Sequence, residues 1–365
     1  MDESDSLVRL IGSDEPLAPS YQQLFARPAS ENFFQSRAWF DNLRRHAAPA
    51  GDRVRLYAVE AADGNPLALM PGVYSRLYET HPRARVLHFL HPDGSNYLPL
   101  LAPGSENPLR VVELVLQSLY SDRRAYDVLR FSPLGRGSAF ADGLSNMLRR
   151  NAHPLEIYRF SDDCYATTTP GSAASYLAAR PPSLCATLEL ASQTLRAAGR
   201  IRFRLVRLPE EVDAGLRDYR KVLEQFGTEP ASESADYLPG IIRAAAECGA
   251  LRLGFIDLDG APVAAQFWIL SAGTARCLRI LSTEHVIDIP LTDILIQDLA
   301  AQFIEDDRVA EMAFGAIDLR LATNWATGRR ERIGLAAFNP RTWRGLKGAA
   351  RHVGARYIKS LFRRG

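Results

Sequence analysis

Residues 250–270 read ALRLGFIDLDGAPVAAQFWIL. Two mainly apolar runs, 250–258 and 261–270, are joined across an Asp-Leu-Asp-Gly turn at 257–260. Asp-Gly pairs tolerate the positive φ angles of tight hairpin turns, and apolar runs on both sides of such a turn are typical of paired strands. The stretch therefore predicts an antiparallel hairpin in the second half of the chain.

The segments around this hairpin predict a repeated order of elements. In the second half we expect helices at 183–198, 210–226, 235–248 and 291–303, and strands at 201–208, 274–282, 310–314 and 333–338. In the first half we expect helices at 34–45, 108–121 and 140–151, and strands at 55–61, 66–74, 86–90, 97–102 and 127–131. The helices have apolar residues at helical spacing, whereas Gly, Asp and Asn mark the turns. Each half reads as helix, antiparallel strands, helix, strand, which indicates an α/β (α+β) fold with an internal repeat. The alternative is that hairpins and helices recur by chance in any mixed fold, and the repeat alone does not decide between the two.

Length and composition are those of a globular protein with two domains. The chain has 365 residues, 47% hydrophobic and 24% charged, and a single core seldom grows beyond roughly 250–300 residues. Neither the cysteines nor the histidines have ligand or disulfide spacing, so no metal is expected. The N-terminus has no signal-peptide pattern, and the longest apolar stretch, 261–272, is shorter than the roughly 20 residues that cross a bilayer. These features predict a cytoplasmic protein.

Charge is unevenly distributed along the chain. The formal net charge is +2, but residues 341–365 contain eight basic and no acidic residues, which leaves 36 basic against 42 acidic residues in the rest. An acidic body argues against a broad nucleic-acid surface, because phosphate binding needs a basic face. No nucleic-acid partner is therefore expected.

Four segments together resemble a known family. They are FQSRAWF at 34–40, DGNPLALMP at 63–71, DGAPVAAQ at 259–266 and the stretch from Met312 to Trp325. In this order and spacing they are similar to the CelD/FemAB-like branch of the GNAT superfamily, with its BioF2-like acetyltransferase domains. The resemblance implies tandem GNAT-like domains, each a mixed, mostly antiparallel sheet flanked by helices. We expect an N-terminal GNAT-like domain at 1–170, an acyltransferase domain with the cofactor site at 171–340 and a basic C-terminal helix at 341–365.

The resemblance also implies acyl transfer. Family members are acyltransferases of cell-envelope and polysaccharide biosynthesis. We therefore expect an N-acyltransferase that uses acyl-CoA or acetyl-CoA and modifies an amine or hydroxyl of a small-molecule or lipid-linked acceptor. FemAB relatives use aminoacyl-tRNA, and this donor stays open as an alternative. A third alternative is a catalytically degenerate binding subunit, because Leu321 and Ala322 stand where relatives often have a Tyr-Lys pair and the chain has no glycine-rich phosphate loop.

The sequence DIPLTD at 288–293 is the best candidate for holding the cofactor. It reads as a helix start, where backbone N–H groups of the first turn and the positive end of the helix dipole favour a pyrophosphate. The expected cofactor-binding residues are Ile289, Leu291, Thr292 and Asp293. The alternative is that Thr292 and Asp293 only favour helix initiation.

Acyl transfer also needs a base for the attacking nucleophile. Glu284 and His285 precede the same helix, and Asp318 follows the next strand. Site residues collect in loops at strand ends, so all three are candidate catalytic residues. Asp318 also matches the acidic position of the family segment before the tryptophan and is the preferred candidate. The alternative for each is a solvated loop charge or a helix cap.

Three further residues are candidates for binding the substrate. The guanidinium of Arg279 suits a phosphate or carboxylate, Asn324 offers a hydrogen bond, and Trp325 offers a rigid wall. The alternatives are an exposed strand arginine and a core tryptophan.

The basic tail predicts an amphipathic helix. Apolar residues recur there at spacings of three and four; they are Trp343, Leu346, Ala350, Val353, Tyr357 and Leu361. A basic amphipathic helix is typical of peripheral contact with an anionic membrane, here the inner face. The alternative is a terminal helix whose apolar face packs on the second domain.

Overall fold

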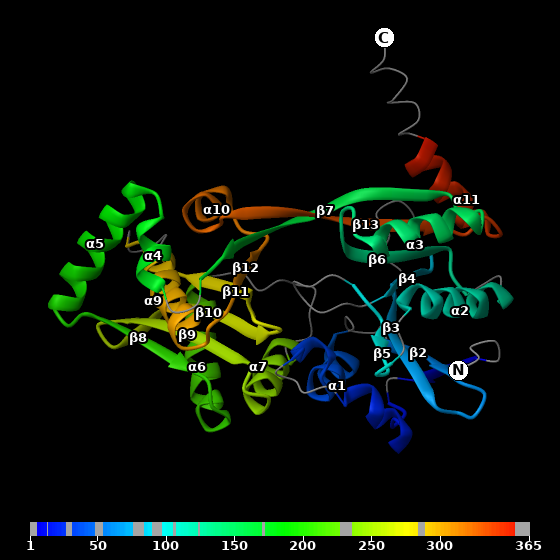
Figure 1. Cartoon of the computed structure of the whole chain (residues 1–365), viewed down its shortest axis with the longest axis horizontal. Coiled ribbons are helices and arrows are strands. Elements are labelled where there is room, and N and C mark those ends of the chain that lie inside the picture. Colours follow the sequence, from blue (N-terminus) through cyan, green and yellow to red (C-terminus); the bar gives the residue numbers. More distant parts are fainter. Residues whose placement is uncertain are drawn as a thin grey trace, which may run out of the picture. The chain divides into compact units, whose positions relative to one another are not determined.

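The computed structural model describes residues 6–12, 14–26, 31–47, 54–75, 84–89, 97–104, 107–122, 125–169, 172–226, 236–283 and 289–354. The chain divides into two compact units. Unit 1 consists of residues 1–27, 43–161 and 331–365, and unit 2 consists of residues 28–42 and 162–330. Two long strands, β7 (Leu155–Thr167) and β13 (Gly328–Phe338), contribute residues to both units, as Figure 1 shows.

Unit 1 contains a mixed, mostly antiparallel sheet in the order β1-β2-β3-β4-β6-β13, with β5 paired to β3. Its other strands are β1 (Leu7–Gly12), β2 (Val54–Glu60), β3 (Pro66–Ser75), β4 (Val86–Phe89), β5 (Leu100–Leu101) and β6 (Val128–Gly135). The neighbours β4 and β6 are parallel, with residues 86–89 opposite 128–131. The helices are η2 (Pro19–Phe25), α2 (Pro108–Ser121), α3 (Ala139–Arg150) and α11 (Trp343–Ala349), followed by the π turn η5 (Ala350–Gly354). Buried faces of α2 and α3 form one core with the sheet.

Unit 2 repeats this architecture. Its sheet has the order β7-β12-β11-β10-β9-β8. The strands are β8 (Ile201–Val206), β9 (Leu251–Leu258), β10 (Ala261–Ser271), β11 (Thr274–Ser282) and β12 (Glu311–Gly315). The helices are η3 (Phe33–Gln35), α4 (Ala173–Ala178), α5 (Pro182–Ala197), η4 (Pro209–Glu211), α6 (Val212–Phe226), α7 (Tyr237–Glu247), α9 (Leu291–Glu305) and α10 (Leu319–Trp325), while α1 (Arg37–His46) has residues in both units. Again one neighbouring pair, β11 and β12, is parallel.

The hairpin predicted from residues 250–270 is β9 and β10. Leu258 pairs with Ala261, and the two residues between them, Asp259 and Gly260, have φ angles of 50° and 83°. Positive φ at both central positions matches the right-handed twist of the flanking strands. The predicted class, mixed and mostly antiparallel sheets flanked by helices, is confirmed.

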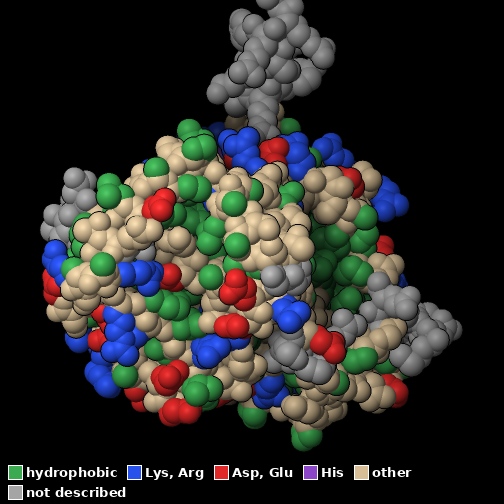
Figure 2. All heavy atoms as spheres, turned by 60° about the vertical axis from the view of Figure 1, so that its left-hand side comes forward, with side chains coloured by type: hydrophobic (Ala, Val, Ile, Leu, Met, Phe, Trp, Pro, Cys, Tyr) green, Lys and Arg blue, Asp and Glu red, His purple; other side chains and the backbone are tan. Residues whose placement is uncertain are grey.

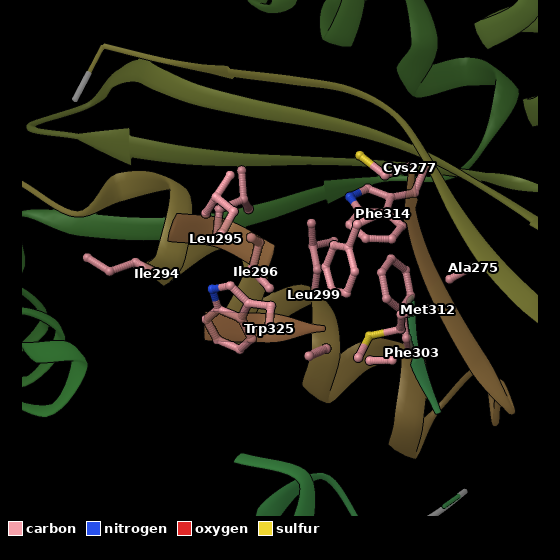
Figure 3. Close-up of a cluster of buried hydrophobic side chains, with 14 of the residues drawn as sticks. Ala275, Cys277, Ile294, Leu295, Ile296, Leu299, Phe303, Met312, Phe314 and Trp325 are labelled. Carbon is pink, nitrogen blue, oxygen red and sulfur yellow. The ribbon is translucent and has the colours of Figure 1, made fainter. Parts of the chain in front are cut away.

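The core of unit 2 forms around α9 and the strands β10 to β12. Figure 3 shows Leu295, Leu299 and Phe303 of α9 in the same cluster as Met312 and Phe314 of β12. Residues of α9 are buried on nearly every side, so this helix is enclosed by its neighbours. Its first turn is therefore held firmly in place.

The described part of the predicted tail helix is helical, as α11 and the π turn η5, but its apolar residues do not share one buried face. Val353 packs, together with Ala349, on a small core cluster of unit 1, while Trp343 and Leu346 are 80% and 44% exposed. Small residues explain this orientation, because a Cβ on Gly345 would lie 2.2 Å from the backbone oxygen of Asn339. The described part of the tail packs on unit 1 through small residues and presents its large apolar residues outward. Tyr357 and Leu361 lie outside the described residues.

Several other boundaries also differ. The predicted helix at 34–45 begins only at Arg37, after a 3-10 turn, and the predicted strand at 97–102 shortens to two residues. Strands β1 and β7 and helix α10 were not predicted. Half-buried and exposed residues make up most of β7, so it lacks the apolar run that would have indicated a strand.

Candidate functional site

Strands β11 and β12 pair over a short distance only. Their parallel register covers Thr274–Arg276 opposite Glu311–Ala313, whereas β11 continues to Ser282 and β12 ends at Gly315. The last residues of β11 thus extend past the end of β12. Helix α9 follows β11 and helix α10 follows β12. Because ligands of α/β sheets bind where neighbouring parallel strands end, this end of unit 2 is the candidate site.

Asp293, in the first turn of α9, connects the two helices. Its carboxylate is 2% exposed; Oδ1 accepts a hydrogen bond from Trp325 Nε1 at 2.6 Å, and Oδ2 accepts one from Arg320 Nη1. A negative charge is favoured near the positive end of a helix dipole. The arginine side chain remains 49% exposed. One buried carboxylate therefore fixes the start of α9 against α10 and holds a cation at the edge of the site.

A second polar residue anchors the same turn. Gln266 of β10 is fully buried; its Nε2 donates to the backbone oxygen of Thr292 at 3.2 Å, and its Oε1 accepts from Trp268 Nε1 at 3.0 Å. Buried amides without partners are costly, so both bonds favour this position of the helix start. The sequence contained a signal for this role, because Gln266 is the one amide within an otherwise apolar strand, but its partner could not be read from sequence.

The predicted cofactor-binding residues lie together at this helix start. Leu291, Thr292 and Asp293 have buried side chains, whereas Ile289 is half-buried. The N–H of Leu291 donates to the Ile289 oxygen at 2.7 Å. This N–H is therefore used within the protein, and the buried side chains of Leu291, Thr292 and Asp293 leave mainly backbone for a ligand to contact. Their role as a cradle of backbone N–H groups stays a prediction.

Asp318 is exposed and forms the N-cap of α10. Its Oδ1 accepts a hydrogen bond from the Leu321 N–H at 2.9 Å. N-cap carboxylates typically contribute about 1 kcal/mol to helix stability. The capping bond gives Asp318 a structural role at the edge of the site, and a catalytic role remains a prediction. Glu284 and His285 lie outside the described residues.

Trp325 belongs to the core. The side chain has no exposed surface, and its ring is stacked 6.5 Å from that of Tyr176. Figure 3 shows it beside Ile294 and Ile296 of α9. Tyr176 Oη and Arg180 Nη1 donate to the Trp325 backbone oxygen at 2.8 and 3.0 Å. The indole thus offers no wall to a substrate in this conformation.

The other two predicted substrate residues are more accessible. Asn324 is half-buried at the end of α10. Arg279 is half-buried on β11, where its Nη1 donates to the Leu278 oxygen at 2.8 Å. Its guanidinium thus folds back onto its own strand. Sequence reasoning missed Arg320, because an exposed arginine in a short helix has no distinguishing pattern.

The cysteine of the site is not a nucleophile in this environment. Cys277 lies on β11 at the edge where pairing with β12 ends, and burial raises the pKa of its thiol well above the ordinary value. A thiol that stays protonated at neutral pH is a weak nucleophile. Cys277 is therefore a poor candidate for a covalent intermediate.

The described residues contain no group of three His, Cys, Asp or Glu residues that could hold a metal ion. In the same part of the chain, no helix is both long enough and apolar enough to cross a bilayer. Charged side chains of both signs are dispersed over the face that Figure 2 presents.

Comparison with known proteins identifies the enzyme class. Residues 184–323 match the family profile described as acetyltransferase (GNAT) domain. Among solved structures, FemX is similar with a TM-score of 0.55 and 9% identity, covering 88% of this chain and 96% of FemX. The C-terminal domain of a protein assigned as a lysylphosphatidylglycerol synthetase from Agrobacterium fabrum has a TM-score of 0.51 and 10% identity, covering 87% of this chain and 90% of that domain. Comparison with curated protein sequences gave no match.

The matched segment runs from α5 to α10 and contains the whole helix start described above. The matched segment is an acetyltransferase (GNAT) domain, which makes the protein an acyltransferase. The fold of the chain is similar to that of FemX.

Proposed function

We propose that the protein transfers an acyl group from acyl-CoA to an amine or hydroxyl of an acceptor in cell-envelope or polysaccharide biosynthesis. The observation that carries the proposal is the start of α9, anchored by Asp293 and Gln266 and located where β11 extends past β12. First-turn N–H groups favour the pyrophosphate of the donor. The part of β11 beyond its pairing with β12 suits the donor's extended amide chain, because such chains pair with strand edges.

The chemistry needs a nucleophile and a proton acceptor. The acceptor's amine or hydroxyl attacks the thioester carbonyl, a new C–N or C–O bond forms, and the C–S bond breaks to release the CoA thiol. The proton lost by the nucleophile passes to a base and reaches the thiolate. Asp318 is the proposed base, because it is an exposed carboxylate at the end of the loop that follows β12. Glu284 and His285 are the other proposed candidates.

Two other functions give different outcomes in the same test. The first alternative is an aminoacyl-tRNA donor, which the FemAB relatives suggest. The second is a catalytically degenerate pair of GNAT-like domains that acts as a binding subunit, which the capping role of Asp318 favours. Thermal unfolding with acetyl-CoA, longer acyl-CoAs, or charged tRNA separates these functions. A donor at 100 times its Kd stabilises the chain by about 2.7 kcal/mol. Stabilisation by charged tRNA alone would replace the CoA proposal, and stabilisation by no donor would favour the binding subunit.

We also propose that the tail contacts an anionic membrane at the inner face, where a lipid-linked acceptor would lie. Trp343 and Leu346 are exposed on α11, and Arg344, Lys347 and Arg351 are exposed beside them. A tryptophan among basic residues suits the headgroup region, and each basic residue near an anionic surface contributes about 1 kcal/mol.

Co-sedimentation with phosphatidylglycerol vesicles at low salt tests this contact. The variant Trp343→Ser/Leu346→Ser should pellet much less than the wild type. A matched control is Leu190→Ser, which removes a leucine that is 73% exposed on α5 in unit 2. Equal pelleting of the tail variant and the wild type would remove the membrane proposal without affecting the donor site.

A further inference from the structure

Unit 1 contains a groove between α2 and α3. Its volume is about 650 Å³, which lies within the usual range of roughly 300–1,000 Å³ for small-molecule sites. The lining residues are Asn107, Leu109, Arg110, Glu113, Gly143, Asn146, Met147, Arg149 and Arg150. All of them belong to unit 1 and to the described residues.

The floor of the groove is apolar and close-packed. Leu109 of α2 rests against Gly143 of α3, where an added Cβ would lie 2.4 Å from the leucine Cδ1. Met147, one turn further along α3, is 6% exposed. The missing side chain at Gly143 lets the two helices approach closely at this point. The floor can therefore hold the apolar part of a ligand.

The rim of the groove is basic. Arg110 is neutralised by Glu113, whose Oε2 lies 2.8 Å from its Nη1. Arg149 and Arg150 are exposed, and neither forms an ion pair with another described residue. Among the described residues, the lining thus contains two arginines without an acidic partner. Guanidinium groups suit phosphate oxygens because they can donate two parallel hydrogen bonds.

The position of the groove in unit 1 can be compared with that of the candidate site in unit 2. Helix α2 comes after β4 and the two-residue strand β5, and α3 follows β6, the parallel neighbour of β4; in unit 2, α9 and α10 follow the parallel strands β11 and β12. Unit 1 thus has a groove between the counterparts of the two helices that build the candidate site of unit 2. We infer that this groove is a second ligand site and that it binds a phosphate ester of small-molecule size.

Different lining residues would contact different groups of the ligand. The phosphate binds Arg149 and Arg150, the side chains of Asn107 and Asn146 offer amides to neutral polar groups, and Leu109 and Met147 contact an apolar part. The Asn107 Oδ1 already accepts from the Leu109 and Arg110 N–H groups at 3.1 and 3.2 Å, so its NH₂ group is the part that serves a ligand.

Methionine-methyl NMR tests this site separately from the donor site. The chain has four methionines, Met1, Met70, Met147 and Met312. Met147 lines the groove, and Met312 lies in the core of unit 2 on β12. Selective ¹³C-methyl labelling of the full chain gives a signal from the groove, assigned with Met147→Leu, and a reference signal from the core of unit 2. Inorganic pyrophosphate, ADP and short-chain phosphatidylglycerol are the probes.

We expect a saturable shift of the Met147 signal with at least one probe. A response to pyrophosphate or ADP assigns a soluble phosphate ester, and a response to phosphatidylglycerol alone assigns a lipid headgroup. Arg149→Gln/Arg150→Gln should weaken this affinity by about tenfold or more, whereas Arg45→Gln, an exposed arginine of unit 1 outside the groove, should leave it unchanged. An unmoved Met147 signal at millimolar probe, or equal affinity in the double variant, would overturn the inference. Failure of the donor proposal would appear instead as unchanged hydrogen exchange at residues 289–294 in the presence of acetyl-CoA.

Discussion

The bond between Trp325 and Asp293 makes a strong prediction about stability. Replacing Trp325 by Phe keeps an aromatic ring but removes the indole N–H that donates to the buried carboxylate at 2.6 Å. A hydrogen bond to a charged group is worth about 1.5–3 kcal/mol, and the smaller ring leaves space that costs about 1 kcal/mol. We expect Trp325→Phe to lower the free energy of unfolding by about 3 kcal/mol. This is a large part of the roughly 5–15 kcal/mol typical of a domain.

Urea unfolding of the full chain, followed by circular dichroism, measures this loss. Hydrogen exchange of peptides from α9 and α10 then shows whether the loss of stability is located in unit 2. The matched control is Trp343→Phe, because that tryptophan is 80% exposed and its replacement should change stability by less than about 0.5 kcal/mol.

A double-mutant cycle isolates the bond itself. In an Asp293→Asn background, the acceptor that Trp325→Phe leaves without its donor is a neutral amide instead of a carboxylate. Trp325→Phe should therefore lower the free energy of unfolding by less in that background, with a coupling energy of at least about 0.5 kcal/mol. If Trp325→Phe is as stable as wild type, or if the two changes are additive, the bond does not anchor α9 to α10.

Three more predictions concern the base, the pH dependence and the tail. Asp318→Asn should lower kcat by about 100-fold or more while the chain stays folded, since Asn also caps helices; unchanged kcat would leave Asp318 with its capping role alone. Burial lowers the pKa of His153, whose Nε2 lies 2.7 Å from the Tyr126 hydroxyl, so its contribution to stability is present above about pH 6.5 and decreases as pH falls. Urea unfolding between pH 5 and 8 should show this decrease in wild type, and a similar decrease in His153→Gln would refute the assignment. Trp343→Ser/Leu346→Ser should leave the urea midpoint unchanged while reducing vesicle binding, because both side chains are exposed; a large drop in stability would mean that they pack on the protein.

The sequence predicted most of the elements because their periodicity is strong. The hairpin at 250–270 had both an apolar pattern and an Asp-Gly turn, and both strands formed as expected. Helix α9 was found from its apolar residues. Strand β7 was missed because it is half-exposed along most of its length. Short helix α10 had no recognisable periodicity, since seven residues make only two turns.

The site was predicted at the level of segments and less well at the level of side chains. The helix start at 289–293 was correctly recognised as a helix start, because a proline followed by Leu-Thr-Asp favours initiation. The partners of Asp293 were not predictable, because Trp325 and Arg320 come from a helix 26 or more residues away in sequence, at positions that only the fold brings near. The sequence also did not show which side of the tail helix faces the protein. Glycine and alanine face it, whereas the predicted contacts were tryptophan and leucine.

The central claim is that acyl-CoA binds at the start of α9, and hydrogen exchange tests it most directly. Exchange of the full chain is measured with and without saturating acetyl-CoA. The account predicts slower exchange of the backbone amides at residues 289–294, with no comparable change in the hairpin turn at 257–260. Unchanged exchange at 289–294, under conditions where binding is shown independently by calorimetry, would contradict the claim.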